Sequence, residues 1–167
     1  MKAVVITISD SCFEGRREDR AGPDLVARLQ KAGFAVEAPM IVPDEMEQIA
    51  DALRERAASA PLIVTTGGTG ISPRDVTPEA TRSVCHRILE GFGEQMRREG
   101  LKDTPMAPLS RAVCGTLGRS LILNVPGNPR GAVQSLESVL HLIPHAIALL
   151  AGDTEHPAEP EPRQRRP

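Results

Sequence analysis

The chain has 167 residues, 40% of them hydrophobic and 25% charged, with a formal net charge of -2. This length suits one globular domain with an apolar core of its own. Nucleic-acid-binding domains usually carry a basic surface or aromatic residues on which bases stack, and the acidic balance and 2% aromatic content argue against both. Anionic small molecules still fit this composition, because backbone N–H groups bind phosphate without net positive charge.

The cysteines and the chain start indicate the compartment. Cys12, Cys85 and Cys114 are odd in number and widely spaced, which predicts free thiols in a reducing environment. No apolar run approaches the roughly 20 residues that span a bilayer. The N-terminal apolar run at 3–8 has no signal-peptide cleavage site after it. We therefore expect a cytoplasmic protein that binds neither membranes nor nucleic acid.

The first half of the chain alternates predicted strands and helices. Apolar, β-branched runs predict strands at residues 3–9, 34–42 and 62–65. Helical spacing of apolar residues predicts helices at 23–32, from 44 onward and from 77 onward.

Two of these helices begin with residues typical of caps. Asp44 can accept the free N–H groups of the helix after it, and Glu47 occupies the acidic position of a capping box. Thr77 precedes Pro78 and Glu79, which combines a hydroxyl cap, a first-turn proline and an acid near the positive helix end. We therefore expect Asp44 and Thr77 to be N-caps.

The second half of the chain is less regular. A short helix is expected at 93–98, then a loop, then two strands at 112–114 and 120–124 across a turn at 115–118. A tight turn at 126–129 should lead into a long helix that ends near Leu150 and is kinked by Pro144. From residue 153 to 167 the chain is polar and proline-rich, which predicts a disordered tail after a domain at 1–152.

The order of elements predicts an α/β fold, with three α/β/α layers, a mostly parallel central sheet and a small β-hairpin segment. Ligands bind such sheets beyond the carboxyl ends of the strands. Four predicted strand ends carry hydroxyls, carboxylates or glycines, in the loops at 9–11, 42–44, 65–75 and 126–129. The charged run at 14–20 borders this edge, although such runs are more often solvated loops.

Gly67, Gly68, Thr69 and Gly70 form a candidate phosphate loop, because glycines let backbone N–H groups approach an anion closely. The loop is not a Walker A motif, since no Gly-Lys-Ser/Thr follows it. It is not a dinucleotide fingerprint either, since Pro73 stands where the third glycine belongs. A plain strand-to-helix turn is an equally good interpretation of these residues.

Asp44 and Asp75 each follow a strand end, so both could face one pocket and hold Mg²⁺, which takes oxygen ligands. The structural alternatives are a helix cap for Asp44 and a surface ion pair with Arg74 for Asp75. His141 and His145 are four residues apart on a predicted helix, but no third ligand accompanies them, and we do not expect zinc there.

Taken together, the motifs resemble the Mog/MoaB family of molybdopterin adenylyltransferases. The resemblance spans residues 2–152 and rests on blocks at 9–10, 42–45, 65–70, 74–80, 91–97, 109–111, 123–129 and 143–146. Each block is weakly specific, and all of them in order are highly specific. The chain departs from the family at Ala21, where serine is common, and at Arg130, where lysine is common.

The resemblance implies that AMP passes from MgATP to the terminal phosphate of molybdopterin, with release of pyrophosphate, in a homotrimer or hexamer. It places catalysis and Mg²⁺ binding on Asp44 and Asp75. It places ligand binding on Ser9, Asp10, Gly67, Gly68, Thr69, Gly70, Ser110, Pro126, Gly127 and Asn128, with the glycine loop on the nucleotide phosphates and 126–128 on the pterin. The alternative is a non-catalytic molybdopterin-binding or molybdate-handling module of the same fold.

Overall fold

The computed structural model describes residues 1–153, so the predicted tail lies outside this range from residue 154 onward. A seven-stranded sheet runs through the centre in the order β2-β1-β4-β7-β6-β5, with β3 also paired to β1. The strands are β1 (Lys2–Ile8), β2 (Ala35–Val36), β3 (Met40–Val42), β4 (Leu62–Thr66), β5 (Arg87–Ile88), β6 (Cys114–Leu117) and β7 (Ser120–Val125). All pairings are parallel except β5 with β6 and β6 with β7, which confirms a mostly parallel sheet with a hairpin.

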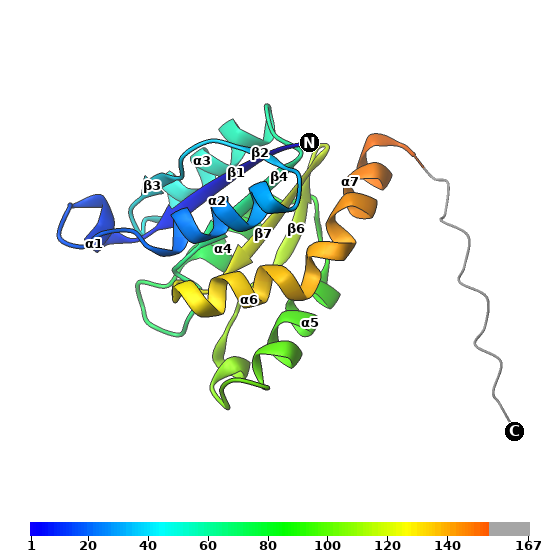
Figure 1. Cartoon of the computed structure of the whole chain (residues 1–167). Coiled ribbons are helices and arrows are strands. Elements are labelled where there is room, and N and C mark those ends of the chain that lie inside the picture. The colour runs from blue at the N-terminus through cyan, green and yellow to red at the C-terminus, as the bar shows by residue number, and fades with distance from the viewer. Residues whose placement is uncertain (154–167) are drawn as a thin grey trace, which may run out of the picture.

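Helices cover both faces of the sheet (Figure 1). One layer holds α2 (Ala21–Lys31), α5 (Glu90–Gly100), α6 (Pro129–Val139) and α7 (Ile143–Ala151), and the other holds α3 (Met46–Ala57) and α4 (Thr77–Val84). Three shorter pieces complete the described chain: α1 (Asp10–Phe13) and the 3₁₀ turns η1 (Ala107–Leu109) and η2 (Leu140–Leu142). The predicted three-layer α/β/α architecture is therefore confirmed.

Strand periodicity explains the two cores. Along β1, Ala3 and Val5 face the α2 and α6 layer, whereas Ile6 and Ile8 face the α3 and α4 layer. Successive strand side chains point to opposite faces, so a strand covered on both faces must be apolar throughout. Every residue of β4 is buried accordingly. This is why the short apolar run at 62–65 predicts a central strand.

Two predicted strand boundaries were wrong. The single strand expected at 34–42 is β2 and β3, with Pro39 between them, and proline has no N–H to donate to a neighbouring strand. The turn expected at 115–118 lies instead at Gly118 and Arg119, because residues 115–117 continue β6. Gly118 has a φ of +58°, which glycine adopts at low cost.

Both predicted N-caps were wrong. The residue before α3 is Glu45, which makes no side-chain cap bond, and the Asp44 carboxylate accepts the N–H of Asp10 instead. Thr77 lies inside α4 after Val76, and its hydroxyl donates to the carbonyl of Gly67 at 2.9 Å. In each case a partner distant in sequence replaces the local helix N–H.

The long C-terminal helix is interrupted at η2, just before Pro144, as the proline predicted. By length and composition alone, the stretch Pro129–Ala151 could cross a membrane, although no such run was expected from the sequence. In the structure Leu136, Val139 and Ile143 are buried in the core against the sheet. This stripe packs on the sheet, and 28% of the most apolar window of the stretch is buried.

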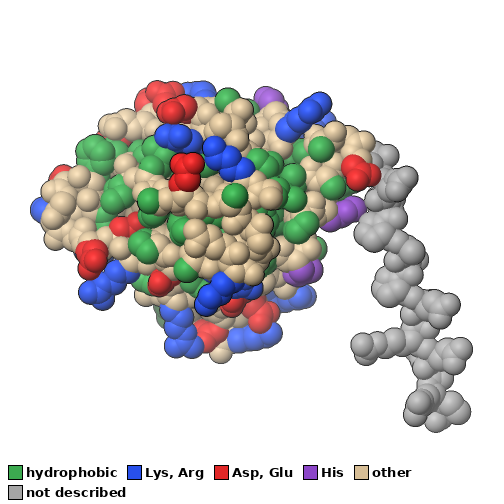
Figure 2. Space-filling model, turned by 45° about the horizontal axis from the view of Figure 1, so that its top comes forward, with side chains coloured by type: hydrophobic (Ala, Val, Ile, Leu, Met, Phe, Trp, Pro, Cys, Tyr) green, Lys and Arg blue, Asp and Glu red, His purple; other side chains and the backbone are tan. Residues whose placement is uncertain are grey.

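The described surface mixes charge signs. Figure 2 shows Lys and Arg side chains beside Asp and Glu side chains over this face, with hydrophobic side chains between them. Ion pairs of this kind include Arg28 with Glu137, which joins α2 to α6 at 2.6 Å. Neither sign forms a continuous stripe on this face, which agrees with the near-neutral net charge of the chain.

Candidate functional site

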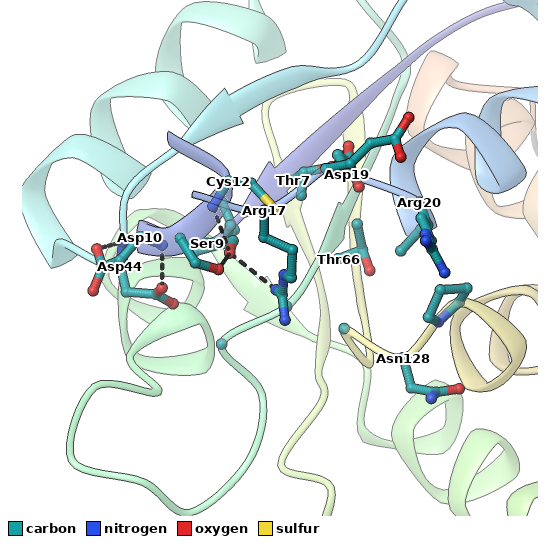
Figure 3. Close-up of a pocket in the computed structure, with 18 of the residues that line it drawn as sticks. Thr7, Ser9, Asp10, Cys12, Arg17, Asp19, Arg20, Asp44, Thr66 and Asn128 are labelled. Atoms are coloured by element: carbon teal, nitrogen blue, oxygen red, sulfur yellow. Dashed lines mark hydrogen bonds between the residues drawn. The ribbon is translucent and has the colours of Figure 1, made fainter. Parts of the chain in front are cut away.

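A cavity of about 820 Å³ opens at the carboxyl edge of the sheet (Figure 3). Its wall includes eight residues predicted from strand ends and from the resemblance: Ser9, Asp10, Asp44, Gly67, Gly68, Asp75, Gly127 and Asn128. They come from the ends of β1, β3, β4 and β7, which are neighbours in the sheet. The strand-end rule thus brings residues from distant parts of the chain into one cavity.

Four predicted ligand-binding residues do not line this cavity. Thr69 is buried and Gly70 follows it in the loop. Pro126 joins the turn at 126–129 to the end of β4, because its carbonyl accepts the Thr66 hydroxyl at 2.7 Å. Ser110 lines a second cavity of about 370 Å³, between α4 and α5.

The acidic end of the cavity is built from Asp10 and Asp44. The N–H of Asp10 donates to the Asp44 carboxylate at 2.8 Å, and the N–H of Asp44 donates to the Asp10 carboxylate at 2.9 Å. Arg74 donates to the same Asp10 carboxylate at 2.8 Å and to Glu45 at 2.9 Å. Asp44 receives no such ion pair among the described residues.

These contacts shift the two carboxyl groups in opposite directions. The Asp44 N–H and the Arg74 guanidinium lower the pKa of Asp10. Burial raises the pKa of Asp44, and the nearby charges of Asp10 and Asp75 add to the shift. An acid whose charged form is disfavoured by burial and by two like charges is well placed to receive a cation.

Asp75 is oriented by the loop that carries it. Its carboxylate accepts the N–H of Ser72 at 2.7 Å, and its own N–H donates to the Ser72 carbonyl at 2.9 Å. The alternative interpretation, a surface pair with Arg74, is not seen among the described residues, because Arg74 binds Asp10 and Glu45. The Asp75 carboxylate is therefore available to the cavity that it lines.

The glycine loop packs against its neighbours and also leaves N–H donors free. Gly67 has a φ of +103°, and a Cβ there would lie 2.2 Å from the carbonyl oxygen of Ile8. Within residues 1–153, the N–H groups of Gly68, Gly127 and Asn128 have no acceptor. All three residues line the cavity, so a strand-to-helix turn and a set of donors suited to an anion are compatible in this region.

Residues 16–20 of the charged segment at 14–20 form a wall of the cavity, which sequence reasoning undervalued. Arg17 donates to the Ser9 hydroxyl at 3.2 Å, and Asp19 accepts the Thr7 hydroxyl at 2.7 Å and the N–H of Gly22 at 3.0 Å. Figure 3 shows Asp10 and Asp44 at one end of the site and Arg20 and Asn128 at the other. The only available signal was the position of this charged run directly after a strand end.

The side chains of the cavity can hold a metal ion only together with ligands from outside the protein. Within residues 1–153, no three His, Cys, Asp or Glu side chains form a group that could hold a metal by themselves. Mg²⁺ commonly binds one or two carboxylates together with substrate phosphates and water. Asp44 and Asp75 fit this pattern of shared coordination. They do not fit a closed site in which every ligand comes from the protein.

Comparisons with known proteins identify the family of the chain. A family profile described as "Probable molybdopterin binding domain" matches residues 4–145. The chain is 40% identical to the molybdopterin adenylyltransferase of Helicobacter pylori strain J99, over 89% of this chain and 87% of that protein. It is 39% identical to "Molybdenum cofactor synthesis protein cinnamon" of Drosophila melanogaster, of which it spans only 25%.

Solved structures give the same result. MoaB of Thermus thermophilus, titled a molybdopterin biosynthesis enzyme, superimposes with a TM-score of 0.84 at 47% identity, over 90% of this chain and 96% of that one. A structure of MogA superimposes with a TM-score of 0.86 at 36% identity, over 90% and 99%. The chain belongs to the family of molybdopterin-binding domains that includes MoaB and MogA.

Proposed function

We propose that the protein is a molybdopterin adenylyltransferase, which transfers AMP from ATP to the terminal phosphate of molybdopterin and releases pyrophosphate. The observation that carries this proposal is one cavity that combines Asp44 and Asp75 with free backbone N–H groups. Relatives that carry this enzyme name match most of this chain and most of their own length.

The transfer requires one bond to form and one to break. An oxygen of the molybdopterin phosphate attacks the α-phosphorus of ATP, and the bond from that phosphorus to the oxygen shared with the β-phosphate breaks as pyrophosphate leaves. Such a reaction depends mainly on positioning and on stabilisation of negative charge. It requires no nucleophile from the protein.

Each residue type suits a different role in the transfer. Asp44 and Asp75 would hold Mg²⁺, which supplies neutralisation of charge on the phosphate chain. The N–H group of Gly68 would donate to the nucleotide phosphates, and those of Gly127 and Asn128 to the phosphate of molybdopterin. Figure 3 shows Asp44 and Asn128 at opposite ends of the site, so we assign the nucleotide phosphates to the acidic end and the pterin to the 126–128 end.

Purified protein incubated with MgATP and molybdopterin should form adenylylated molybdopterin and pyrophosphate. Asp75→Asn is the matched control and should form far less product. The asparagine side chain has the size of aspartate and can still accept the Ser72 N–H. Binding of molybdopterin without adenylylation at saturating MgATP would instead establish a non-catalytic binding module. Larger relatives also contain this domain, which makes up a quarter or less of their length.

We also propose that the protein is a cytoplasmic homotrimer or hexamer that binds neither membranes nor nucleic acid. Closed symmetric assemblies are the general rule for soluble oligomeric enzymes. The family resemblance and the acidic net charge of the chain support this proposal. Light scattering should give a mass of three or six protomers, and a monomer at micromolar concentration would contradict the assembly.

A further inference from the structure

The loop at 69–76 carries both Arg74 and Asp75, so its path determines where the Asp75 carboxylate lies. Its base is closed by the Thr77 N–H, which donates to the Gly68 carbonyl at 3.1 Å. Its outer residues 71–74 are all exposed, and Ile71 is 70% exposed. The outer part of the loop therefore has no apolar anchor in the core.

One arginine from another part of the chain spans this loop. Arg111 lies just before β6, and its backbone N–H donates to the Thr69 carbonyl at 2.9 Å. Its guanidinium donates through Nε to the Gly70 carbonyl at 2.6 Å and through Nη2 to the Asp75 carbonyl at 2.5 Å. The remaining nitrogen, Nη1, binds Glu79 in the first turn of α4.

Arg111 is itself held on the α5 layer. Nη1 of Arg97, from α5, donates to the carbonyls of Ser110 and Ala112, each at 3.3 Å. These two residues flank Arg111 on both sides. The contacts run from α5 through Arg111 to the loop, and Arg111 lines the second cavity and not the first.

We propose that Arg111 is a positioning residue for the adenylyl transfer, which holds the 69–76 loop so that Asp75 faces the large cavity. The proposal rests on the proposed function of that cavity. A guanidinium suits this role because its planar fork presents several donors in fixed directions. Lysine presents a single charged centre, which cannot reach the Gly70 and Asp75 carbonyls and Glu79 in the same geometry.

The test compares Arg111→Lys with two control variants. Glu79→Gln removes the ion pair and leaves both carbonyl contacts of Arg111 in place. Arg82→Lys changes a different arginine, which lies on α4. Like Arg111, Arg82 lines the second cavity, and it pairs with Glu90 at 3.3 Å. Both controls are expected to behave like the parent protein.

For Arg111→Lys we expect kcat to fall about tenfold or more, as misplacement of a catalytic group does, with the KM for molybdopterin unchanged. Backbone amides in 69–76 should exchange hydrogen faster than in the parent, while the melting temperature stays close to that of Arg82→Lys. An unchanged kcat, or unchanged exchange in the loop, would overturn the proposal. Because exchange is measured on the free protein, it reports on Arg111 even if the parent shows no adenylylation, which would refute only the proposed function.

Discussion

Asp10 and Asp44 each accept the other's backbone N–H with a side-chain oxygen, at distances of 2.9 and 2.8 Å. This reciprocal pair joins the segment after β1 to the segment after β3 and sets two carboxylates side by side. Of these two carboxylates, only Asp10 forms an ion pair with Arg74. Of the two, Asp44 is the carboxylate whose charge the folded protein disfavours, which agrees with its raised pKa.

Asp44→Asn should separate activity from stability. The amide oxygen can still accept the Asp10 N–H, but the charge that would hold Mg²⁺ is gone. We expect the adenylylation rate to fall roughly a hundredfold, equivalent to about 3 kcal/mol of transition-state stabilisation. Stability at pH 7, measured by urea unfolding without Mg²⁺, should be equal to or higher than that of the parent. A clearly destabilised variant would show that the charge itself supports the fold.

The pH dependence of that comparison follows from the sign of the shift. The raised pKa of Asp44 means that the folded state binds its proton more tightly than the unfolded state does. Stability contributed by this group is therefore present at low pH and lost as pH rises through the folded pKa. The advantage of Asp44→Asn should shrink as pH falls toward the unfolded value of about 4. A difference that is constant with pH would exclude titration of Asp44 as its source.

Asp75→Asn should lose adenylylation by a similar factor, roughly a hundredfold, because it removes the second Mg²⁺-binding charge. The loop should keep its shape, since an amide oxygen can accept the Ser72 N–H in place of the carboxylate. Molybdopterin affinity should not change, because the pterin is assigned to the 126–128 end. Measuring affinity and turnover on the same preparation tests both statements, and full activity would remove Asp75 from the reaction.

The sequence predicts what depends on periodicity and on strand ends. The β-branched runs of β1, β4 and β7 are visible because both faces of these strands are buried. Parallel order then places Asp10, Asp44 and Gly67 at one edge without any knowledge of their contacts. This reasoning recovered the architecture and eight residues of the cavity wall, but not the wall formed by residues 16–20.

The errors concern partners that are distant in the chain. The capping patterns at Asp44 and Thr77 are local, but their actual partners, Asp10 and Gly67, lie 34 and 10 residues away. Tertiary hydrogen bonds displace a cap when they satisfy buried groups that water cannot reach. The hydrogen bonds from Arg111 to the 69–76 loop could not be predicted for the same reason, since no local sequence pattern relates Arg111 to Gly70.

Gly67→Ala should be much more damaging than a glycine change at another positive φ. A Cβ at Gly67 would meet the backbone carbonyl of Ile8 at 2.2 Å, and backbone cannot rotate away. We expect a loss of several kcal/mol, as for other core overpacking combined with strain. Gly118→Ala is the matched control, because its φ is +58° with nothing within 4 Å, and it should cost about 1 kcal/mol. Equal melting temperatures for the two variants would contradict the close approach.

Thr77 should behave as a buried donor and not as a helix cap. Thr77→Val keeps the shape and leaves the Gly67 carbonyl without its donor, which should cost about 1–3 kcal/mol of unfolding free energy. Thr77→Ser keeps the hydroxyl and should cost less. Thr77→Asp is the decisive variant, because aspartate is a good cap but cannot donate to the carbonyl when ionised. If Thr77→Asp is as stable as Thr77→Ser in urea unfolding, the cap interpretation is correct after all.

Asn124 connects β7 to β4 and α4 through a buried polar cluster. The fully buried amide nitrogen donates to the hydroxyls of Thr65 and Thr81, each at 2.9 Å. Its carbonyl oxygen has no partner within residues 1–153. The amide group of Asn124 therefore stabilises the fold only through these two hydrogen bonds. Its contribution to the free energy of unfolding depends on both threonines being present.

A double-mutant cycle on Asn124 and Thr81 tests this dependence. Asn124→Ala should cost about 2–4 kcal/mol, from two lost hydrogen bonds and a small cavity. Thr81→Val alone should cost about 1 kcal/mol, because it removes one acceptor and leaves the amide otherwise unchanged. In the Asn124→Ala background the same Thr81→Val change should cost nothing, or should stabilise the protein, because the hydroxyl no longer has its amide partner. Unfolding free energies of the parent, both single variants and the double variant give the coupling energy, expected to be about 1 kcal/mol. Strict additivity would show that the amide and the hydroxyl do not interact, and that the α4 layer is held to β7 by its apolar contacts alone.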